Sequence, residues 1–307
     1  MRRIVSSSAL VCVLGAAAAV LPNTVAGQAD SARAPSPFVY DRRAALELSD
    51  SLLRDESGVL VHALSFASPK GGRATGLLFV PGDSGWFPGI VVQHGAPGTA
   101  GTVEALALAI ARRGAVVVAL DAPWARRNAP PFSFTPQDSV DQVQLIVDLQ
   151  RAVDLLLARK DVNPLRLGYV GRSYGAAMGA LLAGVERRLV TYVLQVGDGG
   201  LVAHFTGPDD LPGPPRGVTP PAWQRWLAAM QPIEPIRFVR QAAPASLYFQ
   251  SARRDELIPL MDAERFHRAG SRPKVVSWYD SGHRLNEKAM TDMLQWLHRT
   301  VAIRAPE

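Results

Sequence analysis

Strand-like and helix-like segments alternate along most of this sequence, and the alternation limits the folds that the chain can adopt. Short runs rich in Val, Ile and Leu, such as 89–93 and 115–120, are separated by segments whose apolar residues recur at helical spacing. This order predicts an α/β fold with a mostly parallel sheet and helices on both faces. The expected strands are 59–66, 74–80, 89–93, 115–120, 165–170, 190–196, 245–250 and 274–278, and the expected helices are 103–113, 139–160, 174–185, 260–269 and 287–301.

Local signals support several of these elements. The turn sequence Pro69-Lys70-Gly71-Gly72 joins the first two expected strands into a hairpin. Gly114 stands where a helix C-terminal cap belongs. Ser139 and Gln142 have the spacing of a capping box at the start of the long helix.

One segment interrupts the alternation. Between Pro208 and Pro235 the chain carries eight prolines, together with Trp223 and Trp226. Long irregular segments of this kind are often functional. We therefore expect a lid-like insertion over residues 198–243, before the seventh of eight expected strands. With the loop that carries Trp124, it would shape a substrate pocket.

The N-terminus has the pattern of a secretory signal peptide over residues 1–27. Arg2 and Arg3 precede an apolar run over 9–21, which is shorter than the roughly 20 residues that span a bilayer. A secreted or periplasmic protein without a membrane attachment is expected, and an uncleaved anchor is the alternative. Residues 28–54 are interpreted as a lead-in, and 55–307 as one catalytic or binding domain.

Charge and cysteine content exclude several classes of function. The net charge of +6 falls to +4 when Arg2 and Arg3 leave with the signal peptide, and the basic residues are scattered. Nucleic-acid binding therefore has little support. Cys12 is the only cysteine, so the mature chain would have no thiolate site, and the sequence has no H-E-x-x-H ligand pattern. We expect neither a metal nor a cofactor.

The sequence Gly171-Arg172-Ser173-Tyr174-Gly175 has the form G-x-S-x-G. It follows an expected strand and opens an expected helix, as a nucleophile elbow does, and the small residues after it keep the helix thin. Ser173 is the candidate nucleophile. A structural turn with a capping serine is the alternative interpretation.

A serine hydroxyl needs a base, and the base needs a carboxylate. His283 follows the last strand, at the edge of the sheet where α/β sites gather, and is the candidate base. His94 precedes a glycine at the end of an early strand and is expected to brace a loop. The other four histidines, His62, His204, His267 and His298, are assigned solvated or structural roles, the last two on helix surfaces.

Asp255 is the preferred partner of His283. It follows the strand 245–250 and gives the chain order Ser, Asp, His. Three other carboxylates remain possible: Asp198, Glu256 and Asp280. An oxyanion hole is expected from the backbone N–H groups of Ala96, in the turn His94-Gly95-Ala96-Pro97-Gly98, and of Tyr174.

With these motifs, the sequence resembles the α/β-hydrolase superfamily, within it the dienelactone hydrolase and acyl-peptidase-like branch. The resemblance covers nearly all of 55–303 and rests on HGAPG, GRSYG, SARRDELIP and YDSGHRLN. It implies an α/β-hydrolase fold and the same three catalytic residues. The family often has glycine near the position of Ser251.

The expected function is cleavage of a small-molecule carboxylic ester by an exported serine hydrolase. A peptidase acting on short peptides is the first alternative, although the segment before the core is too short for a propeller domain. A catalytically inactive hydrolase fold that serves as a binding protein is the second. Binding proteins of this kind usually lack one of the catalytic residues, whereas Ser173, Asp255 and His283 are all present here.

Overall fold

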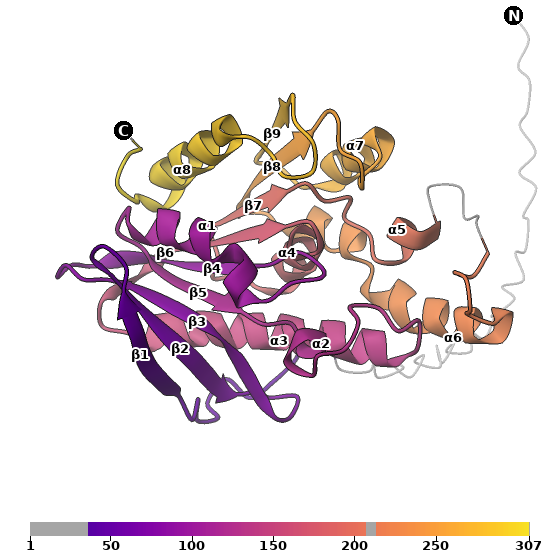
Figure 1. Ribbon diagram of the computed structural model, residues 1–307, viewed down its shortest axis with the longest axis horizontal. Coiled ribbons are helices and arrows are strands. Elements are labelled where there is room, and N and C mark those ends of the chain that lie inside the picture. The colour runs from indigo at the N-terminus through magenta and orange to yellow at the C-terminus, as the bar shows by residue number, and fades with distance from the viewer. Residues whose placement is uncertain (1–35, 207–212, 307) are drawn as a thin grey trace, which may run out of the picture. The chain divides into compact units, whose positions relative to one another are not determined.

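One mixed β-sheet of nine strands organises the part of the chain that the computed structural model describes, residues 36–206 and 213–306 (Figure 1). The strand order is β1-β2-β3-β5-β4-β6-β7-β8-β9. The strands from β5 to β9 run parallel, while β1, β2 and β3 join antiparallel at one edge. The α/β prediction is confirmed.

The elements lie close to their expected positions. The strands are β1 (Ser49–Asp55), β2 (Val59–Ala67), β3 (Arg73–Pro81), β4 (Phe87–Gln93), β5 (Val116–Leu120), β6 (Val162–Arg172), β7 (Thr191–Gln195), β8 (Ser246–Ala252) and β9 (Lys274–Tyr279). The α-helices are α1 (Glu104–Ala111), α2 (Pro123–Arg126), α3 (Gln137–Ala158), α4 (Tyr174–Val185), α5 (Val202–Thr206), α6 (Pro220–Met230), α7 (Leu260–Ala269) and α8 (Glu287–Val301).

Strand β1 is an addition to the eight expected strands. Most of its residues are exposed, including Leu52 and Leu53, so no buried face imposes an alternating pattern on the sequence. It pairs with β2 along the sheet edge. The sheet therefore begins within the 28–54 segment that the sequence assigns to a lead-in.

The capping box expected at the long helix is wrong. Helix α3 begins at Gln137, so Ser139 lies inside its first turn and donates a hydrogen bond from Oγ to the Pro136 carbonyl oxygen at 2.8 Å. The Gln142 side chain accepts a hydrogen bond from the Tyr174 hydroxyl instead. At the C-terminal end of α1, Gly114 adopts φ 78°, as a capping glycine should.

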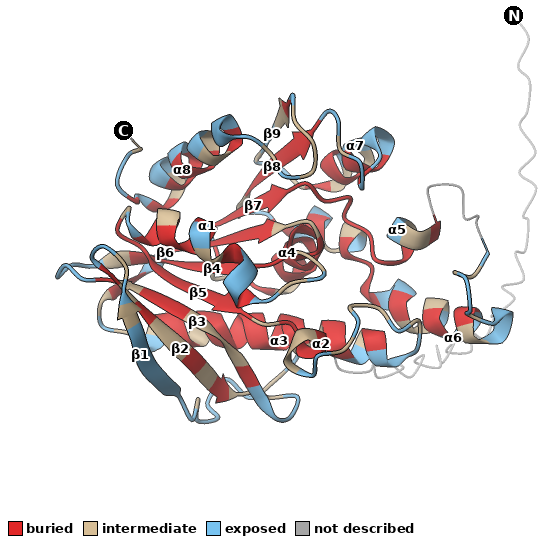
Figure 2. Ribbon diagram, viewed as in Figure 1, coloured by how far each residue is buried: buried red, intermediate tan, exposed pale blue. Residues whose placement is uncertain are grey.

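Helices cover both faces of the sheet, and each face has its own apolar core. Helices α1 and α8 pack on one face, with residues such as Ile110 and Leu297. Helices α3 and α4 pack on the other face, with residues such as Leu149 and Leu181, and α6 packs against α3 (Figure 2). Nearly every residue of α4 is buried, because its glycines and alanines let it approach the sheet closely.

His267 corrects one expectation, because it is buried on α7 and not on a helix surface. Its Nε2 atom lies 2.9 Å from the Oγ of Ser251 near the end of β8. Serine at this position, where the resembled family often has glycine, is therefore part of a buried polar contact.

The expected signal peptide, residues 1–27, lies outside the described residues. Within the described ranges, no helix has both the length and the apolar character needed to cross a bilayer.

Candidate active site

Ser173 occupies a sharp turn between β6 and α4. Its backbone has φ 54° and ψ −118°, which is unfavourable for a residue with a Cβ atom. The flanking glycines permit this turn. A Cβ atom on Gly171 would lie 2.2 Å from the Gly175 carbonyl oxygen, and one on Gly175 would lie 2.3 Å from the Gln93 carbonyl oxygen. The turn therefore has the geometry of a nucleophile elbow.

Asp255 and His283 form a close pair beyond the ends of β8 and β9. The His283 Nδ1 atom lies 2.9 Å from Oδ1 and 3.0 Å from Oδ2 of Asp255. The Asp255 side chain is only 3% exposed, and its Oδ1 also accepts hydrogen bonds from the backbone N–H groups of Leu257 and Ile258, each at 3.0 Å. These contacts fix the carboxylate, which in turn holds the ring proton on Nδ1 and leaves Nε2 unprotonated, as a proton acceptor.

The other candidate carboxylates have different partners. Glu256 accepts a hydrogen bond from the backbone N–H of His283 at 3.1 Å. Asp280 is 78% exposed and pairs with Arg254 at 3.0 Å. Asp198 pairs with His204 at 2.7 Å. Among the four acidic residues considered, Asp255 is the one whose carboxylate holds the His283 ring.

Two backbone N–H groups beside Ser173 are available to a ligand. Tyr174 is the first residue of α4, where N–H groups lack intrahelical acceptors. Ala96 lines the same cavity as Ser173, and no acceptor for its N–H occurs in the described residues. The turn bearing Ala96 is close to the serine, since a Cβ atom on Gly95 would lie 3.3 Å from the Ser173 Cβ.

His94 has the bracing position expected for it. It is fully buried, its Nδ1 donates to the Gly95 carbonyl oxygen at 2.7 Å, and its Nε2 accepts from the Ala122 N–H at 3.1 Å. Burial lowers its pKa from the ordinary histidine value. A neutral ring satisfies both contacts, so His94 ties the Ala96 turn to the segment after β5.

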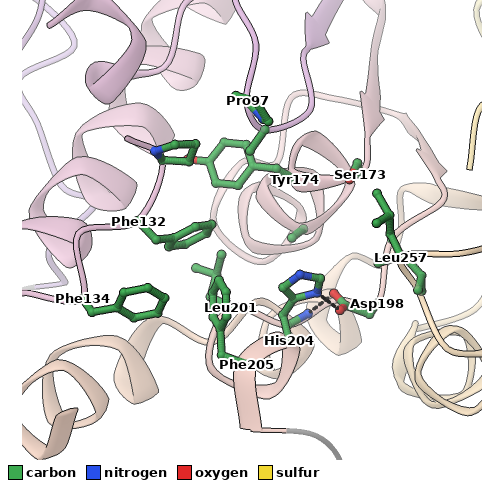
Figure 3. A pocket seen from close by; sticks show the side chains of 16 residues that line it. Pro97, Phe132, Phe134, Ser173, Tyr174, Asp198, Leu201, His204, Phe205 and Leu257 are labelled. Carbon is green, nitrogen blue, oxygen red and sulfur yellow. Dashed lines mark hydrogen bonds and ion pairs between the residues drawn. The ribbon is translucent and has the colours of Figure 1, made fainter. Parts of the chain in front are cut away.

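A cavity of about 390 Å³ opens beside Ser173 (Figure 3). Most of its wall is apolar, and three phenylalanines from two separate segments meet there. The Phe205 ring lies 4.9 Å from Phe132 and 5.0 Å from Phe134, measured between ring centres. The cavity is lined by Ala96, Pro97, Pro131, Phe132, Phe134, Ser173, Tyr174, Ala177, Gly197, Asp198, Gly200, Leu201, His204, Phe205, Leu257 and Ile258.

The three tryptophans expected at the pocket lie behind this wall. Trp124 is buried between His94 and Tyr174, with ring centres 5.5 and 6.0 Å away. Trp223 and Trp226 stack on each other at 4.8 Å, and Trp226 packs against Phe134 at 5.4 Å. None of the three is among the lining residues, so they support the wall instead of forming it.

A single carboxylate holds the loop that carries Phe132 and Phe134. Asp138, buried in the first turn of α3, accepts hydrogen bonds from the backbone N–H groups of Ser133 and Phe134 at 2.9 Å. It also accepts one from the Trp226 indole at 2.8 Å. The sequence reasoning missed Phe132 and Phe134; their signal was two aromatic residues in a Pro-rich stretch between β5 and α3.

Within the described residues, no group of three or more His, Cys, Asp or Glu side chains is arranged to hold a metal ion. The Ser173 hydroxyl and the backbone N–H groups of Ala96 and Tyr174 lie at one cavity. The carboxylate-held imidazole of His283 is linked to the Ser173 turn through the hydrogen bond from Arg172 to the His283 carbonyl oxygen, and the described residues show no hydrogen bond between the His283 ring and the Ser173 hydroxyl. Such a set can activate a nucleophile and stabilise negative charge on a carbonyl oxygen.

Comparisons with known proteins identify the fold. No model of a known protein family matches the sequence, and no curated protein matches it. Among solved structures, an acetyl xylan esterase from Paenibacillus sp. is similar with TM-score 0.66 and 17% identity, over 83% of this chain and 89% of that one. Acetyl xylan esterase 1 from Thermoanaerobacterium sp. gives TM-score 0.68 and 14% identity, over 86% and 91%. An S-formylglutathione hydrolase from Agrobacterium tumefaciens is similar with TM-score 0.60 and 16% identity, over 82% of this chain and 98% of that one. The chain has the α/β-hydrolase fold.

Proposed function

We propose that this protein is a serine hydrolase that cleaves carboxylic esters through an acyl-serine intermediate. The observation that carries the proposal is the strained position of Ser173 at the wall of an apolar cavity. The 2.9 Å contact between His283 and Asp255 supports the assignment of the base and its partner. A strained backbone at a half-buried serine is costly to maintain, which favours a functional role for its side chain.

In the proposed mechanism, the Ser173 Oγ attacks the ester carbonyl carbon while His283 Nε2 takes the hydroxyl proton. Asp255 stabilises the resulting imidazolium through Nδ1. The carbonyl oxygen becomes an oxyanion and accepts hydrogen bonds from the N–H groups of Ala96 and Tyr174. When the intermediate collapses, the bond to the alcohol oxygen breaks and His283 returns its proton to that oxygen.

The second half of the reaction releases the acid. His283 takes a proton from a water molecule, whose oxygen attacks the acyl-serine carbonyl carbon. Collapse then breaks the bond to the Ser173 Oγ, which recovers its proton from His283. The apolar wall formed by Phe132, Phe134 and Phe205 would contact the apolar part of the substrate.

A substrate panel tests the proposal. We expect the wild type to hydrolyse p-nitrophenyl esters, and Ser173→Ala to lose about 10³-fold or more in kcat. Acetylated sugars belong in the panel because two of the similar structures are acetyl xylan esterases. Faster hydrolysis of aminoacyl arylamides than of every ester would favour a peptidase and contradict the ester assignment.

Export is the second part of the proposal. The basic residues Arg2 and Arg3, the apolar run over 9–21 and the small residue Gly27 support a cleaved signal peptide. N-terminal sequencing of the mature protein from a secreting host should begin near residue 28. A membrane-bound protein that retains Met1 would contradict export by cleavage.

A further inference from the structure

A second carboxylate–histidine pair faces the cavity that contains Ser173. Asp198 follows β7, and His204 lies on the short helix α5. The His204 Nδ1 atom is 2.7 Å from Asp198 Oδ2, while Asp198 Oδ1 accepts a hydrogen bond from the Gly200 N–H at 3.0 Å. Figure 3 shows both side chains at the edge of the cavity. This pair takes no part in the mechanism proposed above.

The pair is the main polar feature of an otherwise apolar wall. Apart from Ser173, the lining side chains with polar atoms are Asp198, His204 and Tyr174, and the Tyr174 hydroxyl is already bonded to Gln142. The Asp198 carboxylate is bonded on both oxygens. In the described part of the chain, His204 Nε2 has no hydrogen-bond partner. The His204 side chain is 38% exposed, so a ligand can reach this nitrogen. The free ring nitrogen is thus available to a ligand.

The position of His204 is fixed by a second buried carboxylate. Glu234 accepts hydrogen bonds from the backbone N–H groups of Leu201, Val202 and Ala203 at 2.9 to 3.2 Å, which anchors the start of α5. The next residue, Phe205, packs against Phe132 and Phe134. A recognition group held in this way loses little conformational entropy when a ligand binds.

The charges around His204 indicate what it can bind. Its hydrogen bond to Asp198 raises its pKa above the ordinary value, which favours the imidazolium and an Nε2–H donor. Asp198, Asp262 and Glu234 are the carboxyl groups that face it. These groups balance the imidazolium charge, so an anionic substituent gains little here, whereas an uncharged oxygen acceptor gains a hydrogen bond.

We propose that His204, held by Asp198, is a specificity-determining residue that donates a hydrogen bond to an uncharged oxygen of the substrate, such as a ketone, ether or hydroxyl oxygen. This inference rests on the proposed ester hydrolysis at Ser173. The preferred substrates would then be esters that carry such an oxygen at a distance from the scissile carbonyl. Purely aliphatic esters would fill the cavity but leave Nε2 unpaired.

Two matched substrate pairs test this inference. The acyl pair is p-nitrophenyl pentanoate and p-nitrophenyl 4-oxopentanoate, and the alcohol pair is hexyl acetate and 2-propoxyethyl acetate. We expect kcat/KM of the wild type to favour the oxygen-bearing member of at least one pair by about tenfold. His204→Phe should bring that ratio close to 1, because the oxygen-bearing member loses more of its kcat/KM than the aliphatic member does. His204→Gln keeps a donor and should retain part of the preference.

The pH dependence of the ratio gives a second measurement. The preference should fall as the pH rises through the pKa of His204, because the neutral ring carries its proton on Nδ1, toward Asp198. A purely structural role would lower both members of a pair equally in His204→Phe and leave the ratio unchanged with pH. That result, or wild-type ratios near 1 in both pairs, would overturn the inference. Failure of the wild type to hydrolyse any of the four esters would contradict the proposed function itself.

Discussion

Arg172 donates a hydrogen bond from Nη2 to the backbone carbonyl oxygen of His283, at 3.0 Å. Arg172 directly precedes Ser173, so this contact connects the loop of the candidate base to the turn of the candidate nucleophile. Catalysis depends steeply on such distances. We interpret Arg172 as a positioning residue, which acts through His283 and does not contact the reacting atoms.

Replacing Arg172 by Gln should lower kcat by about 10- to 100-fold, because a displacement near 1 Å of a catalytic group costs up to that much. KM should change little, since Arg172 is not among the residues that line the cavity. Steady-state kinetics on a p-nitrophenyl ester measures both values. Arg172→Lys, which keeps one donor, should recover part of the rate. The exposed Arg254, paired with Asp280 at 3.0 Å, gives the matched control Arg254→Gln, and equal losses in the two variants would contradict the positioning role.

Asp255→Asn should lower kcat by about 10⁴-fold, because the amide favours the wrong tautomer of the His283 ring. The fold should survive, since an amide oxygen can still accept the hydrogen bonds of the neighbouring backbone. The control is Asp280→Asn at the 78% exposed carboxylate nearby, which should retain full activity. A large loss in Asp280→Asn with little loss in Asp255→Asn would transfer the role to Asp280.

Buried His267 should make stability depend on pH. Burial lowers its pKa from 6.5 to about 4, so between these values the unfolded chain binds a proton that the folded chain does not. The free energy of unfolding should therefore fall as the pH is lowered from 6.5 toward 4, by roughly 3 kcal/mol from this residue. In His267→Gln that component should disappear. Urea unfolding at several pH values measures it. A slope with pH that is the same in both proteins would contradict the prediction. The pKa of His94 is also lowered, so the free energy of unfolding of His267→Gln should still depend on pH, but less steeply than that of the wild type.

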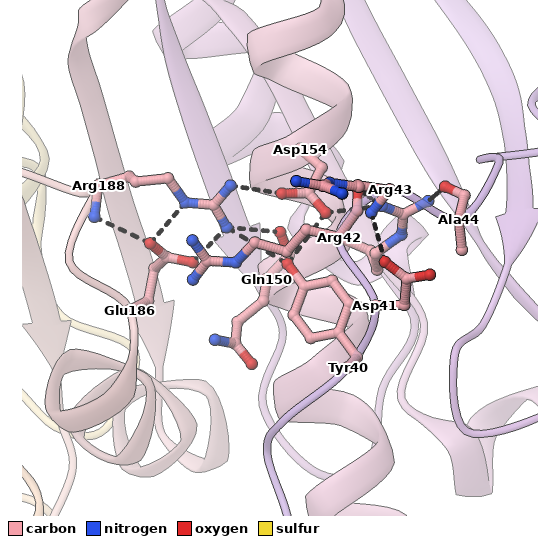
Figure 4. Close-up of polar contacts among 10 residues, drawn as sticks. Tyr40, Asp41, Arg42, Arg43, Ala44, Gln150, Asp154, Glu186 and Arg188 are labelled. Carbon is pink, nitrogen blue, oxygen red and sulfur yellow. Dashed lines mark hydrogen bonds and ion pairs between the residues drawn. The ribbon is translucent and has the colours of Figure 1, made fainter.

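A network of ion pairs and hydrogen bonds anchors residues 40–44 against α3 (Figure 4). Arg151 is 2% exposed, contacts Asp154 at 2.7 Å and donates to the Ala44 carbonyl oxygen at 2.8 Å. The Tyr40 hydroxyl donates to the same Asp154 carboxylate at 2.9 Å. Arg151→Met should cost about 2 kcal/mol, since the carbonyl oxygens of Arg42 and Ala44 lose their donor while Asp154 keeps Arg188 and Tyr40. Tyr40→Phe should cost about 1 kcal/mol.

Urea denaturation measures both effects. The control is Arg159→Met, which removes a pair with Asp161 at 2.6 Å whose side chains are 25% and 32% exposed. It should cost less than about 1 kcal/mol. A cost in Arg151→Met no larger than in the control would show that the network does not anchor this segment.

The parallel part of the sheet could be predicted because each buried strand and each packed helix has a distinct apolar period. Strand β1 could not, because its side chains are exposed on both faces and so follow no burial pattern. The pairing of His283 with Asp255 was predicted from the positions of both residues after neighbouring strands, whose ends meet at one edge of the sheet, and from the family resemblance.

The cavity wall was harder to predict. The tryptophans were predicted to line the pocket because they are large and rare. The Trp226 indole N–H, however, donates a hydrogen bond to Asp138 in the interior. The phenylalanines, which have no polar atom to satisfy, form the wall instead. The partners of Asp198 and His204 depend on how the insertion folds, and sequence spacing does not fix that.

The central claim is that Ser173 is an activated nucleophile, and covalent labelling tests it most directly. The wild type should react with a fluorophosphonate probe at one site, and peptide mass spectrometry should locate the adduct on Ser173. His283→Ala should label much more slowly, and Ser173→Ala should not label. An unlabelled wild type, or equal labelling of Ser173→Ala, would contradict the account.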